Sequence, residues 1–321
     1  MAKLKVFITY PIPEKGIRLL QKKLDITVMR KKLSYKELLT ATRGYNGVLC
    51  LLTDKIDAKF LNANKDSLKI VANYAVGFDN IDIKTAQDLG IYVSNTPGVL
   101  TEAVGEHAIG LALALLRKIV EADKFTKAGK YKGWDPRLFL GMQLMGKTMG
   151  IVGLGRIGSY VAQIAHKGFS MSILYNDVKP NAEFEKDYSA KYLKLGDLLK
   201  RSDIVSLHVP LIEATQHLIS IKQLSMMKKT AILINTSRGP VVDEKALVQA
   251  LSKGIIAGAG LDVFENEPKL APGLCKLNNV ILTPHVASAT EEAREAMAQI
   301  AAENILDVLA RGAKPRNLVV A

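Results

Sequence analysis

Short apolar runs alternate with amphipathic stretches along the first hundred residues of this 321-residue chain. Apolar and β-branched runs of this kind predict buried strands, whereas apolar positions repeated at helical spacing predict helices. We expect strands at 5–9, 47–52, 69–75 and 91–94 and helices at 15–23, 35–43 and 83–89. Because consecutive parallel strands need crossover connections, the pattern predicts a parallel sheet covered by helices.

A second series of the same kind begins at Lys147. Its six apolar runs fit the strands of a doubly wound sheet of the size that binds dinucleotides. Between the two series we expect one long apolar helix at 101–119, and after Ser288 a long amphipathic helix that ends at Gly312. The chain is therefore predicted to be an α/β protein of two domains. The six strands are expected at 148–152, 172–175, 203–208, 231–235, 257–263 and 280–283.

Composition narrows the class of protein. Hydrophobic residues make up 48% of the chain and charged residues 23%, as in soluble globular proteins. The longest apolar stretch, 108–116, is far shorter than the roughly 20 residues of a membrane span. The amino terminus lacks the pattern of a signal peptide, so we expect a cytoplasmic protein with no membrane partner. Cys50 and Cys275 lie outside any CxxC or Cys/His cluster, which predicts reduced thiols and no metal site.

The net charge of +13 raises the question of a nucleic-acid partner. Lysines and arginines are spread along the whole chain, and the longest cluster is 30–32. No basic stripe with interleaved aromatic residues is present, so we expect a solvated basic surface and no nucleic-acid interface. A positive field would also attract anionic substrates.

A glycine motif, GxGxxG, follows the first strand of the second series at Gly153, Gly155 and Gly158. Strand, glycine turn and helix occur in the order that a dinucleotide-binding fingerprint requires. The glycines permit a tight turn, a close approach of the pyrophosphate and close helix packing. Backbone amides around Arg156 and Ile157, at the start of the helix, would then face the phosphates.

An acidic residue, Asp177, closes the second strand about twenty residues after the glycines. A carboxylate at this position accepts hydrogen bonds from the ribose hydroxyls and repels a 2′-phosphate. The sequence therefore predicts NAD(H) as the preferred cofactor. Lys179, two residues further on, leaves NADP(H) open.

Reactive side chains follow several strands of the second series, where an open α/β sheet gathers its ligands. Arg238 suits a carboxylate anchor, because its planar fork donates two hydrogen bonds. His285 suits proton transfer, and a carboxylate such as Glu267 would orient the ring and favour the imidazolium. These three residues are our candidates for the oxidation of a hydroxy acid or the reverse reaction. His208 competes with His285 from the same end of the sheet.

Long ordered motifs now show a family resemblance. The chain resembles the D-isomer-specific 2-hydroxyacid dehydrogenase family over essentially its full length. The matching segments are NYAVGFDNID (73–82), GIVGLGRIG (150–158), SLHVPL (206–211), ILINTSRGPVVDE (232–244), AGAGLDVFENEP (257–268) and TPHVASAT (283–290).

The resemblance implies roles for the same three residues. In that family the arginine of TSRG binds substrate, the glutamate of FENEP pairs with the histidine, and the histidine of TPH transfers the proton. These positions are Arg238, Glu267 and His285. The family also implies a flavodoxin-like substrate domain, residues 1–100 plus 289–321, into which a dinucleotide-binding domain of residues 101–288 is inserted, with the active site in the cleft.

Further contacts are implied by the resemblance alone. Backbone amides at Val76 and Gly77 would hold the substrate carboxylate, with Leu52 as a further substrate contact. Asp262 would hydrogen-bond near the nicotinamide carboxamide. The remaining implied cofactor contacts are Thr101, His208, Pro210, Thr215, Thr236, Arg238 and His285.

Within the family, the chain most resembles the glyoxylate and hydroxypyruvate reductases. The segments that carry this likeness are 133–148 and 49–57. In that group the tryptophan equivalent to Trp134 packs against the partner subunit's active site and restricts it to short substrates, which implies a homodimer. We expect hydride transfer from NADH to a short 2-oxo acid. D-lactate, phosphoglycerate or a broad set of 2-oxo acids remain alternatives, as does a non-catalytic NAD sensor.

Overall fold

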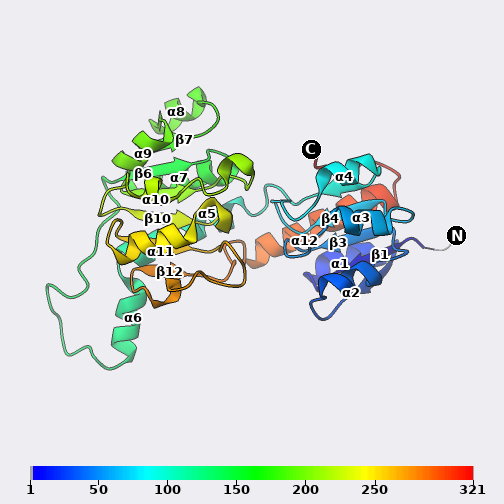
Figure 1. Ribbon diagram of the computed structural model, residues 1–321, viewed down its shortest axis with the longest axis horizontal. Helices are drawn as coiled ribbons and strands as arrows, with labels where there is room; N and C mark the ends of the chain where they lie inside the picture. The colour runs from blue at the N-terminus through cyan, green and yellow to red at the C-terminus, as the bar shows by residue number, and fades with distance from the viewer. Residues whose placement is uncertain (1–2, 321) are drawn as a thin grey trace. The chain divides into compact units, whose positions relative to one another are not determined.

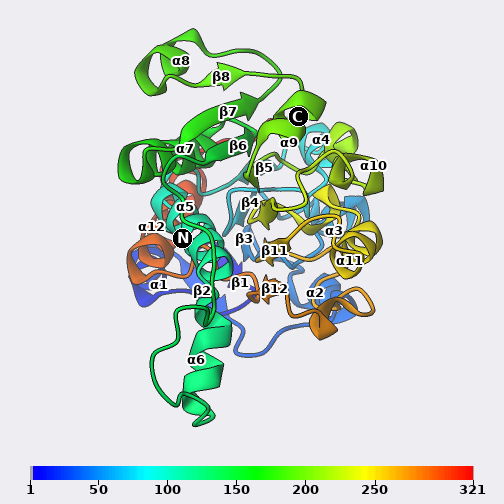
Figure 2. The same cartoon turned by 90° about the vertical axis from the view of Figure 1, so that its left-hand side faces the viewer.

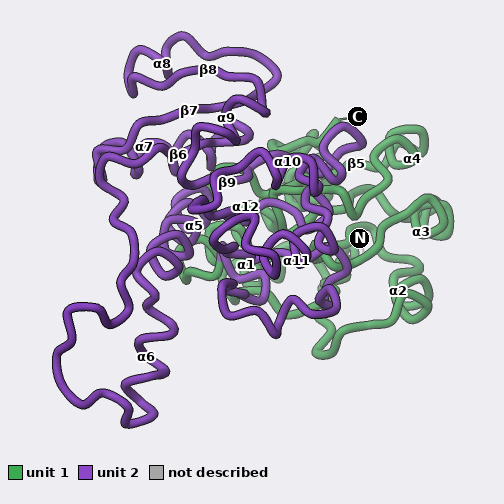
Figure 3. The backbone as a smooth tube through the Cα atoms, turned by 60° about the vertical axis from the view of Figure 1, so that its left-hand side comes forward, with its two compact units in different colours: residues 1–100, 289–321 green, residues 101–288 purple. Residues whose placement is uncertain are grey.

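Two parallel sheets, one in each of two compact units, make up the computed structural model, which describes residues 3–320 (Figure 1). Unit 1 consists of residues 1–100 with 289–321, and unit 2 of residues 101–288 (Figure 3). The α/β class with two parallel sheets, which the sequence predicts, is confirmed.

Unit 1 contains a five-stranded sheet in the order β2-β1-β3-β4-β5, which is the order of flavodoxin-like sheets. Every residue of β3 and β4 is buried, because helices cover both faces of the sheet. The strands are β1 (Lys5–Ile8), β2 (Asp25–Val28), β3 (Gly47–Cys50), β4 (Ile70–Asn73) and β5 (Tyr92–Ser94). The helices are α1 (Glu14–Gln21), α2 (Tyr35–Ala41), α3 (Ala58–Asn64), α4 (Ile83–Asp88) and α12 (Glu291–Leu309).

Unit 2 contains a seven-stranded sheet in the order β12-β11-β10-β9-β6-β7-β8. The chain starts at the central strand β6, extends to one edge and then returns to β9, so the order reverses between β6 and β9 as in doubly wound sheets. Its strands are β6 (Thr148–Val152), β7 (Ser172–Asn176), β8 (Lys191–Tyr192), β9 (Ile204–Leu207), β10 (Ile232–Asn235), β11 (Gly258–Leu261) and β12 (Val280–Leu282). Its helices are α5 (Thr101–Leu116), α6 (Ile119–Lys127), α7 (Arg156–Phe169), α8 (Ala182–Tyr188), α9 (Leu195–Arg201), α10 (Ile221–Leu224) and α11 (Glu244–Ser252), with the short 3-10 helices η1 (Glu213–Thr215), η2 (Gly239–Val241) and η3 (Leu274–Lys276).

Some elements are missing from the prediction, and the edge strands among them lack a clear apolar signal. The edge strands β2 and β8 and the helix α3 were not predicted, and unit 2 has seven strands in place of six. The strand β2 is only half-buried, and β8 has two residues at the edge of the sheet beyond β7 (Figure 2). An edge strand buries fewer side chains, so its hydrophobic pattern is weak.

The single long helix expected at 101–119 is wrong. Helix α5 ends at Leu116, and α6 begins only after Lys118, whose φ of 53° is left-handed. The carbonyl of Leu116 accepts a hydrogen bond from the backbone amide of Met142 (3.0 Å) in place of continuing the helix. Gly141 lies so close that an added Cβ would stand 2.0 Å from the Leu116 oxygen. The returning segment therefore caps α5.

None of the helices formed within residues 3–320 is both long enough and apolar enough to cross a membrane.

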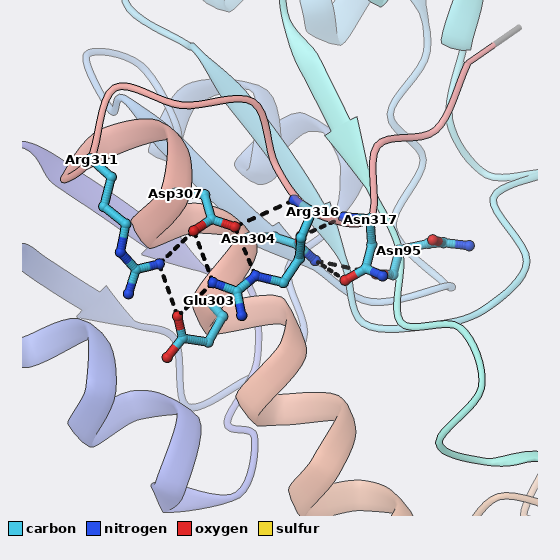
Figure 4. A network of polar contacts seen from close by, with 7 residues as sticks. All are labelled: Asn95, Glu303, Asn304, Asp307, Arg311, Arg316 and Asn317. Atoms are coloured by element: carbon cyan, nitrogen blue, oxygen red, sulfur yellow. Dashed lines mark hydrogen bonds and ion pairs between the residues drawn. The ribbon is translucent and has the colours of Figure 1, made fainter.

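A network of charged side chains closes the last turn of α12 onto the segment that follows it (Figure 4). Asp307 is 6% exposed and accepts two hydrogen bonds from the guanidinium of Arg316, each 2.9 Å long, one from the Arg316 backbone amide (3.3 Å), and another from Arg311. Both arginines also contact Glu303. Hydrogen bonds from Arg316 outweigh the effect of burial and, with those from Arg311, lower the pKa of Asp307 to about 2.

We expect Asp307→Asn to lower the free energy of unfolding at neutral pH by roughly 1–2 kcal/mol, because a lowered carboxyl pKa stabilises the folded state. The arginines are half-exposed, so solvent weakens the interaction and keeps the effect small. This contribution is complete above the unfolded pKa near 4 and is lost as the pH falls towards 2, so the difference from wild type should narrow there. Urea denaturation at several pH values measures it. The exposed pair Asp123–Lys127 provides the control: Asp123→Asn should change stability by less than about 0.5 kcal/mol. Equal losses in both variants would contradict the prediction.

Candidate active site

The glycine loop joins β6 to α7 in unit 2. Gly153 has a φ of 94°, and a Cβ there would lie 2.8 Å from the carbonyl carbon of His208. A Cβ at Gly158 would lie 2.0 Å from the Gly153 oxygen, so the helix packs tightly on the turn. At Gly155, the N-cap of α7, a Cβ would meet no other group within 4 Å. The loop is therefore tightly packed at Gly153 and Gly158 but open at Gly155. This arrangement fits a phosphate group that approaches the helix amides of Arg156 and Ile157.

Asp177 follows β7 directly and contacts the glycine loop. Its carboxylate accepts hydrogen bonds from the backbone amides of Leu154 and Val178, both 2.6 Å. The residue as a whole is half-buried. The sequence relates Asp177 to the glycines only by their spacing, and in the structure Asp177 contacts the glycine loop directly.

A second polar group of unit 2 fits a bound cofactor. The hydroxyl of Thr236, at the end of β10, is buried and has no hydrogen-bond partner among the described residues. Because a buried polar atom without a partner is costly, this hydroxyl fits a site that a ligand completes. Among the other cofactor contacts implied by the resemblance, Thr215 of η1 donates to the carbonyl of Pro210 (2.6 Å), and Thr101 is the first residue of α5.

His285 and Glu267 meet in unit 2 although they follow different strands. The Nδ1 atom of His285 lies 2.9 Å from a carboxylate oxygen of Glu267, and the two side chains are 25% and 28% exposed. Because an ionised carboxylate only accepts, Nδ1 carries the proton of this bond and Nε2 is left for a ligand. Burial raises the pKa of Glu267, but hydrogen bonds from His285 and the Phe264 amide and the charges of His285 and Arg238 outweigh it, so the pKa is lowered.

Arg238 lies at the end of β10, where the chain enters η2. Its guanidinium donates to the carbonyl of Ser237 (2.9 Å), and its positive charge contributes to the lowered pKa of Glu267. Arg238 and His285, which come after two other strands, therefore both act on the carboxylate of Glu267. Such a set can anchor a carboxylate and exchange a proton with an adjacent oxygen.

Asp262 holds the loop that carries His285. It is completely buried, and its oxygens accept hydrogen bonds from the hydroxyl of Thr283 (2.6 Å) and the amides of Val286 (2.9 Å) and Ala287 (2.8 Å). The amide of His285 donates to the Asp262 carbonyl (2.9 Å). The structure thus gives Asp262 a role in positioning the loop, and the contact with the carboxamide stays a prediction.

His208, the alternative proton donor, is in a different state. Loss of hydration around the ring lowers its pKa to about 3, and its Nε2 pairs with the hydroxyl of Ser206 at 2.8 Å. An imidazole with this pKa is neutral at physiological pH and cannot donate a proton as an imidazolium. The lowered pKa of His208, together with the contact between His285 and Glu267, therefore favours His285 as the proton donor.

The loop that carries Glu267 is held by residues that the sequence pattern did not single out. Glu244, the buried first residue of α11, accepts hydrogen bonds from the amides of Glu265 (2.8 Å) and Ala271 (3.1 Å). Glu265 accepts one in return from the Glu244 amide (3.3 Å). A Cβ on Gly239 would overlap the backbone of Phe264 at 1.9 Å, so only glycine permits this approach. An acid at the start of a helix is common because it interacts favourably with the helix dipole. The sequence therefore offers no reason to expect that Glu244 holds a distant loop.

The substrate residues implied by the resemblance lie partly in unit 1. Leu52 follows β3, and Val76 and Gly77 follow β4, both in loops at the carboxyl ends of their strands. Trp134 belongs to the segment between α6 and β6 of unit 2, where it is 83% exposed. The described residues contain no group of three or more His, Cys, Asp or Glu side chains able to hold a metal ion.

Comparisons with known proteins identify the family of this chain. Residues 109–287 match the family model described as "D-isomer specific 2-hydroxyacid dehydrogenase, NAD binding domain". A glyoxylate reductase of Thermococcus litoralis is 51% identical, with 98% of this chain and 96% of that protein covered. A glyoxylate reductase of Korarchaeum cryptofilum is 49% identical over 98% of this chain and 95% of its own length.

Solved structures show the same fold along the whole chain. A glyoxylate reductase of Paecilomyes thermophila has a TM-score of 0.88 at 31% identity, with 99% of each chain covered. An NADPH-dependent glyoxylate/hydroxypyruvate reductase of Sinorhizobium meliloti, solved with NADP and malonate, has a TM-score of 0.88 at 33% identity, with 99% of this chain and 97% of that chain covered.

The fold and the glycine loop define a dinucleotide-binding protein of the doubly wound class. The chain belongs to the D-isomer specific 2-hydroxyacid dehydrogenase family.

Proposed function

We propose that this protein reduces glyoxylate, and with it hydroxypyruvate, with NADH. The observation that carries the proposal is the 2.9 Å contact between His285 and Glu267, a proton donor paired with its counter-charge at the end of a dinucleotide-binding sheet. The names of relatives at about 50% identity support glyoxylate as the substrate. Trp134, packed against the active site of a second copy, is the proposed residue that limits the length of the substrate, and Leu52 is a further proposed substrate contact.

The proposed chemistry balances one hydride and one proton. The nicotinamide cofactor, when bound, supplies the hydride that adds to the carbonyl carbon of the 2-oxo acid. His285 donates its Nε2 proton to the carbonyl oxygen, and Glu267 stabilises the imidazolium before that transfer. Arg238 binds the carboxylate and carbonyl oxygens through its planar fork. In unit 1, the amides of Val76 and Gly77 bind the substrate carboxylate.

The catalytic assignment is tested with His285→Ala and Glu267→Gln. Loss of a general acid removes a factor of about 10²–10⁴ from kcat, and we expect His285→Ala to fall in that range, with a smaller loss for Glu267→Gln. Stopped-flow or steady-state oxidation of NADH with glyoxylate measures both. Quenching of protein fluorescence by NADH should be retained, because neither change removes the glycine loop.

A second histidine–carboxylate pair gives the matched control. His217 lies 2.8 Å from Glu265, and His217→Gln should leave kcat within about threefold of wild type. Wild-type turnover by His285→Ala would refute the catalytic role. A panel of glyoxylate, hydroxypyruvate, pyruvate and phosphohydroxypyruvate separates the proposal from a D-lactate, phosphoglycerate or broad-range enzyme. Absence of turnover with every acid, together with NADH binding, would favour the NAD sensor.

We also propose a preference for NAD(H) over NADP(H), supported by the carboxylate of Asp177 beside the glycine loop. Loss of charge-assisted hydrogen bonds to the ribose in Asp177→Ala should raise the KM for NADH about tenfold and leave the KM for NADPH unchanged or lower. Steady-state kinetics with both cofactors measures the ratio. Asp187→Ala, an exposed acid in α8, is the control and should change neither constant. A wild-type enzyme that uses both cofactors equally well would contradict the preference.

A homodimer is the proposed assembly, and the exposed apolar residues of unit 2 support it. Helix α6 and the segment after it extend away from the sheet of unit 2 (Figures 1 and 2), and there Ile119, Trp134 and Leu140 are 52%, 83% and 67% exposed. Exposed apolar residues along one projecting segment favour an interface, and a second copy of the chain is the proposed occupant. We expect Leu140→Asp to halve the mass measured by light scattering, whereas Val320→Asp, an exposed apolar control, should not. A wild-type monomer would refute this proposal.

A further inference from the structure

The loop after β4 in unit 1 is held by three hydrogen bonds to its carbonyl groups. The Thr96 amide donates to the carbonyl of Ala75 (2.9 Å), and the side-chain amide of Asn95 donates to the carbonyl of Val76 (2.7 Å). The side-chain amide of Asn73 donates to the carbonyl of Gly77 (2.8 Å). Three successive peptide groups of this loop are therefore fixed in orientation.

Each fixed carbonyl also sets the direction of an N–H group. The peptide bonds on both sides of Val76 are trans, and in a planar trans peptide the C=O and the N–H point in opposite directions. When Thr96 holds the Ala75 carbonyl, the Val76 N–H must point away from Thr96. When Asn95 holds the Val76 carbonyl, the Gly77 N–H must point away from Asn95. The two amides assigned to the substrate carboxylate are thus aimed by the residues directly after β5.

We propose that Asn95 is a positioning residue for substrate binding: its side-chain amide turns the Val76–Gly77 peptide so that the Gly77 N–H binds the carboxylate of the 2-oxo acid. This inference rests on the proposed function, in which that N–H contacts the substrate. Asn95 itself contacts the carbonyl oxygen of this peptide, on the side opposite to the Gly77 N–H.

The carboxyl-terminal segment in turn holds Asn95 (Figure 4). The backbone amide of Asn95 donates to the carbonyl of Asn317 (3.3 Å), and its carbonyl accepts from the side chain of Asn304 (3.3 Å). Asn304 is completely buried in α12 and also accepts from the Asn317 amide (3.0 Å). Arg316, the neighbour of Asn317, is bound to Asp307. The segment after α12 therefore belongs to the support of the substrate loop.

The test is Asn95→Asp, which keeps the shape of the side chain and replaces the donor by an oxygen that repels the Val76 carbonyl. We expect the KM for glyoxylate and the inhibition constant of oxamate, a carboxylate-bearing analogue, to rise about tenfold. The kcat should stay within about threefold and the KM for NADH should not change, because a misaimed carboxylate anchor weakens substrate binding first. Asn95→Ser, which removes the amide without adding charge, should show the same split more weakly and decides the matter if Asn95→Asp does not fold.

Asn62→Asp is the matched control, since the Asn62 amide also donates to a backbone carbonyl (2.8 Å), but from an exposed position on α3. It should leave all constants at wild-type values. If wild type reduces glyoxylate while Asn95→Asp and Asn95→Ser keep its KM and oxamate inhibition, the positioning role is overturned and the proposed function stands. A uniform loss of kcat and of thermal stability without a selective rise in KM also overturns it. If wild type reduces no 2-oxo acid, the proposed function fails instead.

Discussion

The contact between Glu267 and His285 is the interaction on which the proposed chemistry depends. Removing a carboxylate from water costs free energy unless charge and hydrogen bonds compensate. Here the imidazole and the Phe264 amide provide that compensation, and the net pKa of Glu267 is lowered. Only an ionised Glu267 fixes the proton of His285 on Nδ1 and leaves Nε2 for a ligand. The two loops that carry this pair must therefore be held rigidly.

The surrounding structure holds both loops by their backbones. Asp262 accepts hydrogen bonds from the amides of the two residues after His285. Glu244 accepts them from one amide before Glu267 and one after it. Both acids are buried, and each accepts hydrogen bonds from two backbone N–H groups of a loop. Gly239 allows the segment after β10 to contact the backbone of Phe264. The Arg238 segment therefore packs against the loop that carries Glu267.

The central strands were predicted from the sequence because their apolar runs are unambiguous. The glycine loop and the three candidate residues were predicted because each comes after one of the predicted strands. The sequence could not show β2 and β8, whose edge positions bury few side chains. Nor could it show the break at Lys118, which depends on Met142 returning to the end of α5. Glu244 was missed for a similar reason, since its partners are backbone amides of a distant loop. Tertiary contacts of this kind leave no local periodicity.

The two units use opposite kinds of side chain for the same task of orienting a polar group. In unit 2 the group to be oriented is a cation-forming imidazole, and an ionised carboxylate both aims the ring and stabilises its charge. In unit 1 the groups are neutral peptides whose proposed ligand is an anion. A carboxylate at Asn95 or Asn73 would repel both the carbonyl it faces and that anion, whereas a neutral amide donates without adding negative charge. The choice between carboxylate and amide thus follows from the group to be held: a carboxylate accepts from N–H groups, whereas an amide can donate to a carbonyl oxygen.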